Sequence, residues 1–156
     1  MLSSMRTKAV AAILVGALAL PALAAPAAPA DAIRARINGY RELGAAFKAV
    51  NDGLRGSEVQ TILIQQSARQ IRNAAREQYA WFAPGSASAP GVKTYARPEI
   101  WRNAAEFKGL QDAFARQAEA LQRAAATGNA TTLRLEARKL GGTCKACHDK
   151  FRIEKD

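Results

Sequence analysis

Cysteine, histidine and methionine are scarce in this chain of 156 residues, which has two cysteines, one histidine and two methionines. So few cysteines exclude a disulfide-rich secreted scaffold, which needs several cysteine pairs. A structural zinc site normally takes four cysteine or histidine ligands, and the whole chain supplies three. Whatever chemistry these residue types perform must therefore be concentrated in one place.

Acidic residues are also few, with 13 Asp and Glu against 23 Lys and Arg, so that the formal net charge is +10. The basic side chains form no long run and no patch interleaved with aromatic residues, which argues against a nucleic-acid partner. We interpret most of these basic side chains as lying on solvent-exposed faces of helices. Anionic membrane surfaces and acidic redox partners are the alternatives that such a charge leaves open.

The only long apolar run lies at the N-terminus, from Ala9 to Leu20. Arg6 and Lys8 precede it, and an A-x-A sequence ending at Ala24 follows it. This order is typical of a secretory signal peptide, whereas a run interrupted at Pro21 is short for a membrane anchor. We expect residues 1–24 to be cleaved near Ala24, leaving a periplasmic chain of residues 25–156.

Both cysteines and the only histidine occur together, as Cys144, Cys147 and His148. Cys-x-x-Cys-His is the attachment sequence of a c-type haem, in which the thiols bond to the porphyrin and the imidazole ligates the iron. A disulfide between Cys144 and Cys147 would close a very small loop and restrict the unfolded chain little. A thioredoxin-like redox pair needs a βαβ context, which the sequence does not show. The motif therefore predicts one haem c, bound through both cysteines.

The first half of residues 25–156 shows helical periodicity and no alternating strand pattern. Apolar residues recur every three or four positions after Asp31, which we expect to act as an N-cap, as far as Leu54. A second helix is expected to begin at Ser57, with Gln60 completing a capping box, and to run to about Phe82. A loop rich in Pro, Gly and Ser then extends over residues 83–96.

The second half predicts two further helices. Pro98 suits the first turn of the third, Gly128 ends it, and Asn129 caps the fourth. The fourth helix carries apolar residues at spacings of 4, 3, 4, 3 and 4, and both cysteines lie on the resulting inward seam: Leu133, Ala137, Leu140, Cys144, Cys147 and Phe151. His148 lies one residue further round and can face the same pocket. We predict an all-α antiparallel four-helix bundle with a covalently bound haem near its C-terminal helix.

The expected mature chain lacks the residues that usually provide a second ligand to haem iron. Met1 and Met5 are the only methionines, and both belong to the expected signal peptide. The mature chain then has no methionine, no second histidine and no free cysteine. A lysine, a tyrosinate or the amino terminus can ligate iron only after losing a proton. We therefore favour a five-coordinate, high-spin iron.

The mature chain resembles cytochrome c′, the class II c-type cytochromes, over nearly its whole length. Its Cys-x-x-Cys-His lies near the C-terminus and is followed by Phe151 and Arg152. The first helix matches through Arg36-Ile37-Asn38-Gly39-Tyr40, and the stretches 82–85 and 96–101 look like the family's linker and the start of its third helix.

The resemblance implies roles for four further residues. Tyr40 would cover the vacant face of the haem, and Phe82 would help to wall it. Arg36 would pair with a haem propionate, and Arg152 would lie near the proximal imidazole. The alternatives are ordinary core packing for the two aromatic residues and solvated surface positions for the two arginines.

These features predict a periplasmic haem protein that binds small gaseous ligands such as NO and CO and can exchange electrons. A periplasmic electron-transfer cytochrome with no gas-binding role is the alternative, with a redox partner that the sequence does not identify. An enzyme is not expected, because no acid–base histidine remains beside His148. The resemblance also implies a homodimer packed through the first two helices, which the apolar Ile62-Leu63-Ile64 run modestly supports.

Overall fold

The computed structural model describes residues 28–56 and 58–154. The expected signal peptide and the expected cap at Ser57 lie outside these residues. Within them the chain forms four long helices and two short ones, and no strand beyond two isolated bridges. The all-α prediction is confirmed. The helices are α1 (Pro29–Arg55), α2 (Thr61–Glu77), η1 (Gln78–Trp81), α3 (Glu99–Arg102), α4 (Ala104–Thr127) and α5 (Ala130–Phe151).

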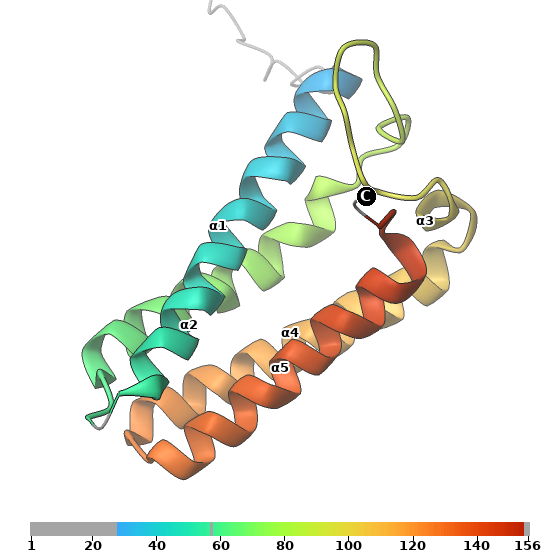
Figure 1. The fold of residues 1–156 in the computed structure, drawn as a ribbon. Helices are drawn as coiled ribbons and strands as arrows, with labels where there is room; N and C mark the ends of the chain where they lie inside the picture. Colours follow the sequence, from blue (N-terminus) through green and yellow to red (C-terminus); the bar gives the residue numbers. More distant parts are fainter. Residues whose placement is uncertain (1–27, 57, 155–156) are drawn as a thin grey trace, which may run out of the picture.

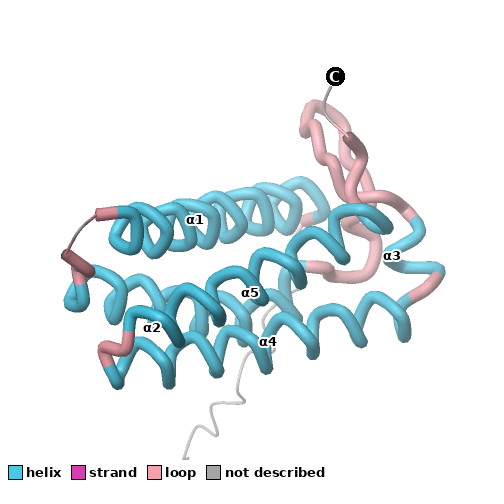
Figure 2. Tube along the Cα trace, turned by 60° about the horizontal axis from the view of Figure 1, so that its bottom comes forward, coloured by secondary structure: helices cyan, strands magenta, loops and turns pink. Residues whose placement is uncertain are grey.

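The four long helices run alternately up and down, as predicted for an antiparallel bundle (Figures 1 and 2). α1 packs on α2, α2 on α4, and α4 on α5, whereas α1 and α5 meet only sparsely. Figure 1 shows the two helix pairs converging at the end that holds the α1–α2 and α4–α5 turns. They diverge toward the end that holds α3 and the C-terminus. None of the described helices has the length and hydropathy needed to cross a bilayer.

The last helix begins and continues as its residues predict. Gly128 adopts a left-handed conformation with φ of 68°, which ends α4 at little steric cost. The Asn129 side chain then accepts a hydrogen bond from the backbone amide of Thr132 at 2.9 Å, which caps α5. α5 continues without a break to Phe151, so the cysteines lie within a regular helix.

Four predicted helix boundaries are wrong. α1 begins two residues before Asp31, because Pro29 occupies a first-turn position that needs no amide hydrogen. α2 begins only at Thr61, and Gln60 is its cap residue without a side-chain hydrogen bond rather than part of a capping box. α2 tightens into the 3₁₀ turn η1 after Glu77 and does not continue as an α-helix to Phe82. The predicted third helix is divided at Asn103, whose backbone leaves the helical region (φ −110°, ψ 45°). Asparagine competes for backbone hydrogen bonds and so favours such interruptions.

The core has two parts along the bundle. The main cluster includes Cys144 as a partly buried member, and its largest fully buried side chains are Val50, Ile64, Ile71, Leu121, Leu133 and Leu140. A second, smaller cluster of Ile100, Phe107 and Phe151 lies at the divergent end, where Phe82, Trp101 and Cys147 pack against it. The cysteine pair therefore lies at the junction of the two clusters.

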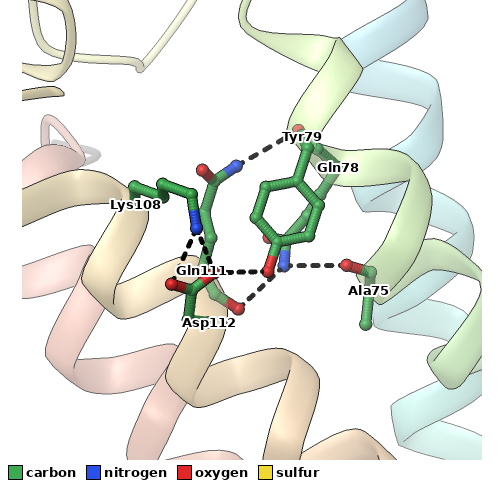
Figure 3. Close-up of polar contacts among 6 residues, drawn as sticks. All are labelled: Ala75, Gln78, Tyr79, Lys108, Gln111 and Asp112. Atoms are coloured by element: carbon green, nitrogen blue, oxygen red, sulfur yellow. Dashed lines mark hydrogen bonds and ion pairs between the residues drawn. The ribbon is translucent and has the colours of Figure 1, made fainter. Parts of the chain in front are cut away.

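A polar clasp fixes η1 against α4 (Figure 3). The amide nitrogen of the Gln78 side chain donates to the backbone carbonyl of Gln111 at 3.3 Å, and that of Gln111 donates to the carbonyl of Gln78 at 3.2 Å. Both side chains are buried. On the outer side the Tyr79 hydroxyl donates to Asp112, which also accepts from Lys108. Because buried amides are costly to leave unpaired, the clasp holds the segment that carries Trp81 and Phe82.

Gly39 permits the close approach of η1 to α1. A Cβ atom at this position would lie 2.4 Å from the Trp81 ring, closer than any van der Waals contact allows. The indole also packs edge-on against Tyr40, with ring centroids 4.9 Å apart, and this contact restricts its movement away from α1. The absence of a side chain at Gly39 thus allows Trp81 to pack against both α1 and the Tyr40 ring.

We predict that Gly39→Ala lowers the free energy of unfolding by about 1–3 kcal/mol, the usual cost of overpacking. Gly44→Ala is the matched control on the same helix, because nothing lies within 4 Å of the added methyl group; it should raise stability by about 0.5–1 kcal/mol through helix propensity. Urea unfolding followed by circular dichroism measures both. Equal stabilisation by the two substitutions would contradict the packing of Trp81 on α1.

Candidate haem-binding site

The two thiols lie on the inner seam of α5 as predicted. Cys144 packs against the main core cluster and Cys147 against the second. Both are free thiols, and burial raises the pKa of each, that of Cys147 to about 11. They are therefore neutral near pH 7 and lack the low pKa of redox-active cysteines.

His148 lies at the edge of this seam and is more exposed than the cysteines. Partial desolvation lowers the pKa of its imidazole, and the nearby cation of Arg152 lowers it further. A neutral imidazole is the form that binds a metal. Arg152 is itself exposed, and its amide donates to the His148 carbonyl at 3.0 Å, the last helical hydrogen bond of α5.

Tyr40 faces the cysteines from α1. Its ring packs against Trp81 and Phe82, with centroids 4.9 and 6.1 Å away. Burial raises the pKa of the phenol well above its usual range; Cys147 adds to this, and the cation of Arg36 opposes it. Within the described residues the Tyr40 hydroxyl has no hydrogen-bond partner. It is therefore a protonated donor without an acceptor in residues 28–56 and 58–154.

Aromatic rings fill the region between α1 and the end of α5. Phe82 is their centre, at 6.1 Å from Tyr40, 6.0 Å from Trp101 and 4.6 Å from Phe107, measured between ring centroids. Phe107 in turn lies 5.2 Å from Phe151, edge to face. These contacts form an apolar wall that joins the two diverging helix pairs.

Arg36 is buried, with 2 % of its surface exposed, and is not a solvated surface arginine. Its guanidinium donates to the carbonyls of Trp81 and Ser86 at 3.4 and 3.1 Å. It also donates to the hydroxyls of Ser86 and Thr94 at 3.1 and 3.2 Å. Its Cζ atom lies 5.0 Å from the centre of the Phe82 ring. Burial lowers the pKa of this guanidinium.

Every hydrogen-bond partner of Arg36 within the described residues is neutral. The guanidinium is hydrogen-bonded, but its charge has no carboxylate beside it. A buried cation without a counter-ion is costly. An anionic group brought to this site would offset that cost.

The residues present fit a haem by their chemistry. Two neutral thiols and one imidazole lie close together on one helix. The rings of Phe82 and Trp101 pack on the same core cluster as Cys147, the phenol of Tyr40 lies near both thiols, and the buried Arg36 cation lies over the Phe82 ring. The thiols match the vinyl groups of a haem, the imidazole matches the iron, and the cation matches a propionate.

The sequence analysis assigned no role at the site to five contributing residues: Gly39, Trp81, Ser86, Thr94 and Trp101. Trp81 directly precedes Phe82, and a second aromatic residue beside a predicted wall residue was a signal that pointed to it. Ser86 and Thr94 carry no periodic signal, because they lie in a loop and act through contacts with α1 that are distant in sequence.

A family profile described as cytochrome c′ matches residues 31–152. The chain belongs to the cytochrome c′ family. It is 31 % identical over 128 residues to the cytochrome c′ of Alcaligenes xylosoxydans, a match that covers 81 % of this chain and 97 % of that relative. The resemblance drawn from the sequence is confirmed, and with it membership of a haem-binding family.

Solved structures agree with this assignment. One is a cytochrome c′ described as having an unusual ligand-controlled dimer dissociation; it has a TM-score of 0.79 and 27 % identity, and the match covers 83 % of this chain and all of that one. Another is the nitric oxide complex of a mutant of cytochrome c′ from Alcaligenes xylosoxidans, with a TM-score of 0.75 and 30 % identity, covering 84 % of this chain and all of that one. Both are four-helix bundles of the cytochrome c′ type.

Proposed function

We propose that this chain carries one haem c, attached through Cys144 and Cys147 with His148 as the axial ligand, and that it binds small gaseous ligands such as NO and CO in the periplasm. It is a ligand-binding protein rather than an enzyme, and it can also exchange electrons. The main support is a single Cys-x-x-Cys-His on α5 with the protonated phenol of Tyr40 nearby, which donates to no described residue. The mature chain holds no other strong ligand for the iron.

When bound, a haem c supplies an iron that can take diatomic ligands and change oxidation state. The residues of this chain control access to it. The thiols of Cys144 and Cys147 would attach it to the seam of α5. The imidazole of His148 would ligate the iron, and the aromatic wall around Phe82 would exclude water from the site.

Two arginines would stabilise the charge states that haem binding needs. Arg36 is buried without an anionic partner, so a propionate would supply the missing counter-charge. Arg152 is exposed beside the imidazole and lowers its pKa. We propose that Arg152 keeps the imidazole neutral and available as a ligand, while Arg36 orients the carboxylate edge.

Export and assembly complete the proposal. The signal-peptide pattern of residues 1–24 supports a periplasmic location, where thiol attachment of haem takes place. A homodimer is supported by two apolar side chains of α2: Ile62 is 73 % exposed and Leu63 is 37 % exposed. A solved relative is described as showing ligand-controlled dimer dissociation, and we propose that this chain also dimerises, through α1 and α2.

We expect the purified protein to show a c-type haem with high-spin ferric and ferrous spectra and a clear spectral change when NO is added to the ferrous form. Cys144→Ser and Cys147→Ser should each reduce covalent haem retention on a denaturing gel, because each removes one attachment bond. Ala146→Ser, between the cysteines, is the matched control and should retain haem. Purely low-spin spectra would refute the open iron site.

We predict that Tyr40→Phe weakens binding of CO to the ferrous protein about fivefold to tenfold, because a hydrogen bond is worth about 1 kcal/mol. The stretching frequency of bound CO should rise as the donor is lost. Tyr79→Phe removes the same atom from a tyrosine that donates to Asp112 on the other side of η1, and it should change neither quantity. An unchanged CO frequency in Tyr40→Phe would show that the phenol does not reach the ligand.

The dimer is tested with Ile62→Lys, which places a charge on the proposed interface and should shift the protein toward monomer by at least about tenfold in dissociation constant. Leu135→Lys changes another apolar residue, 43 % exposed on α5, and should leave assembly unchanged. Sedimentation equilibrium at micromolar concentration measures both. A monomeric wild-type protein, or equal effects of the two variants, would contradict the interface.

A further inference from the structure

The loop of residues 83–97 lies between η1 and α3 in the chain, and it is hydrogen-bonded both to α1, which carries Tyr40, and to the residues that follow His148. Figure 1 shows it rising beside the N-terminal half of α1 and returning past the C-terminus. It makes hydrogen bonds to other elements at both ends, to α1 through Arg36 and to the end of α5 through backbone groups. It therefore spans the divergent end of the bundle.

At α1, Arg36 holds the loop from one helical turn before Tyr40. Two of its hydrogen bonds go to Ser86, whose side chain is fully buried. The Ser86 hydroxyl donates onward to the carbonyl of Ala83 at 2.7 Å, and the Trp101 indole donates to the same carbonyl at 3.1 Å. The first part of the loop is thus tied to α1 and α3 together.

At α5, backbone groups hold the loop to the segment after His148. The amide of Arg97 donates to the Phe151 carbonyl at 2.9 Å, and the amide of Ile153 donates to the Tyr95 carbonyl at 2.7 Å. An isolated antiparallel bridge between Ala96 and Arg152 lies between these two bonds. The Arg152 amide itself bonds to the His148 carbonyl.

Thr94 joins the two ends. Its hydroxyl oxygen accepts from Arg36 at 3.2 Å and from the amide of Ala96 at 3.2 Å. The oxygen therefore links the buried guanidinium of α1 directly to the short stretch paired with Arg152. The linkage therefore runs from Arg36 through Thr94 to Ala96 and, across the bridge, to Arg152. The Arg152 amide bonds to the His148 carbonyl.

We propose that Arg36 and Thr94 are positioning residues that fix the orientation of the His148 imidazole from the opposite side of the site. The inference rests on the proposed role of His148 as the iron ligand. Arg36 is well suited to this task because its guanidinium is buried. Breaking one of its hydrogen bonds would leave a donor without water to replace the lost acceptor, which costs free energy. Loss of the Thr94 acceptor frees residues 95–97, and with them the pairing that holds residues 151–153.

The test compares Thr94→Val, which keeps the shape but removes the acceptor, with Thr94→Ser, which keeps the acceptor. In the ferrous haem-loaded protein we expect Thr94→Val to shift or broaden the iron–histidine stretching band in resonance Raman spectra, and Thr94→Ser to restore the native band. Amide hydrogen exchange at Arg97 and Ile153 should accelerate by about tenfold or more in Thr94→Val alone. Thr131→Val, at an exposed position near the start of α5, is the control.

Each outcome decides the inference. Faster exchange in Thr94→Val with an unchanged iron–histidine band would mean that Thr94 only fastens the loop, and would overturn the proposal. Unchanged exchange and an unchanged band would overturn it as well. If the native ferrous protein shows no iron–histidine band, the proposed five-coordinate ligation is wrong and this inference fails with it. A native band that Thr94→Val leaves unaltered refutes only the positioning role.

Discussion

The burial of the Arg36 guanidinium is the constraint on which the divergent end of this bundle depends. A cation removed from water must have its donors satisfied, and a helical neighbour cannot provide several acceptors at once. The loop after η1 and the end of η1 itself supply them, with two carbonyls and two hydroxyls. The path of the loop beside α1 follows from this requirement, because the loop has little apolar surface of its own to bury.

The second requirement at this end is apolar. The two helix pairs separate where Tyr40, Phe82 and Phe107 lie, and side chains of ordinary size cannot bridge diverging helices. Large aromatic rings in edge-to-face contact fill the region. Arg36 joins the two requirements, since its guanidinium lies over the Phe82 ring while it bonds to the loop. Arg36 therefore both hydrogen-bonds to the loop and packs on the aromatic ring of Phe82.

The sequence predicted local features well and non-local ones poorly. The seam of α5, the left-handed Gly128 and the Asn129 cap depend on residues within a few positions of one another, so spacing and residue type reveal them. The 3₁₀ turn after Glu77 is held by hydrogen bonds between Gln78 and Gln111 of α4, which are distant in sequence. The burial of Arg36 was the largest surprise at the site. Its acceptors lie 45 to 58 residues away along the chain, and an arginine on a helix is otherwise expected to be solvated.

The phenol of Tyr40 illustrates why the nature of one side chain decides what the site can do. A thioether or a neutral imidazole in its place would offer the iron a lone pair without losing a proton. The phenol offers a strong ligand only as phenolate, and burial raises its pKa. The neutral thiols beside it do nothing to favour that ionisation, and the Arg36 cation, which does favour it, has a smaller effect on the Tyr40 pKa than burial has. What Tyr40 has available is therefore its hydrogen, so this face of the site is suited to a ligand that accepts a hydrogen bond rather than to closure by the protein itself.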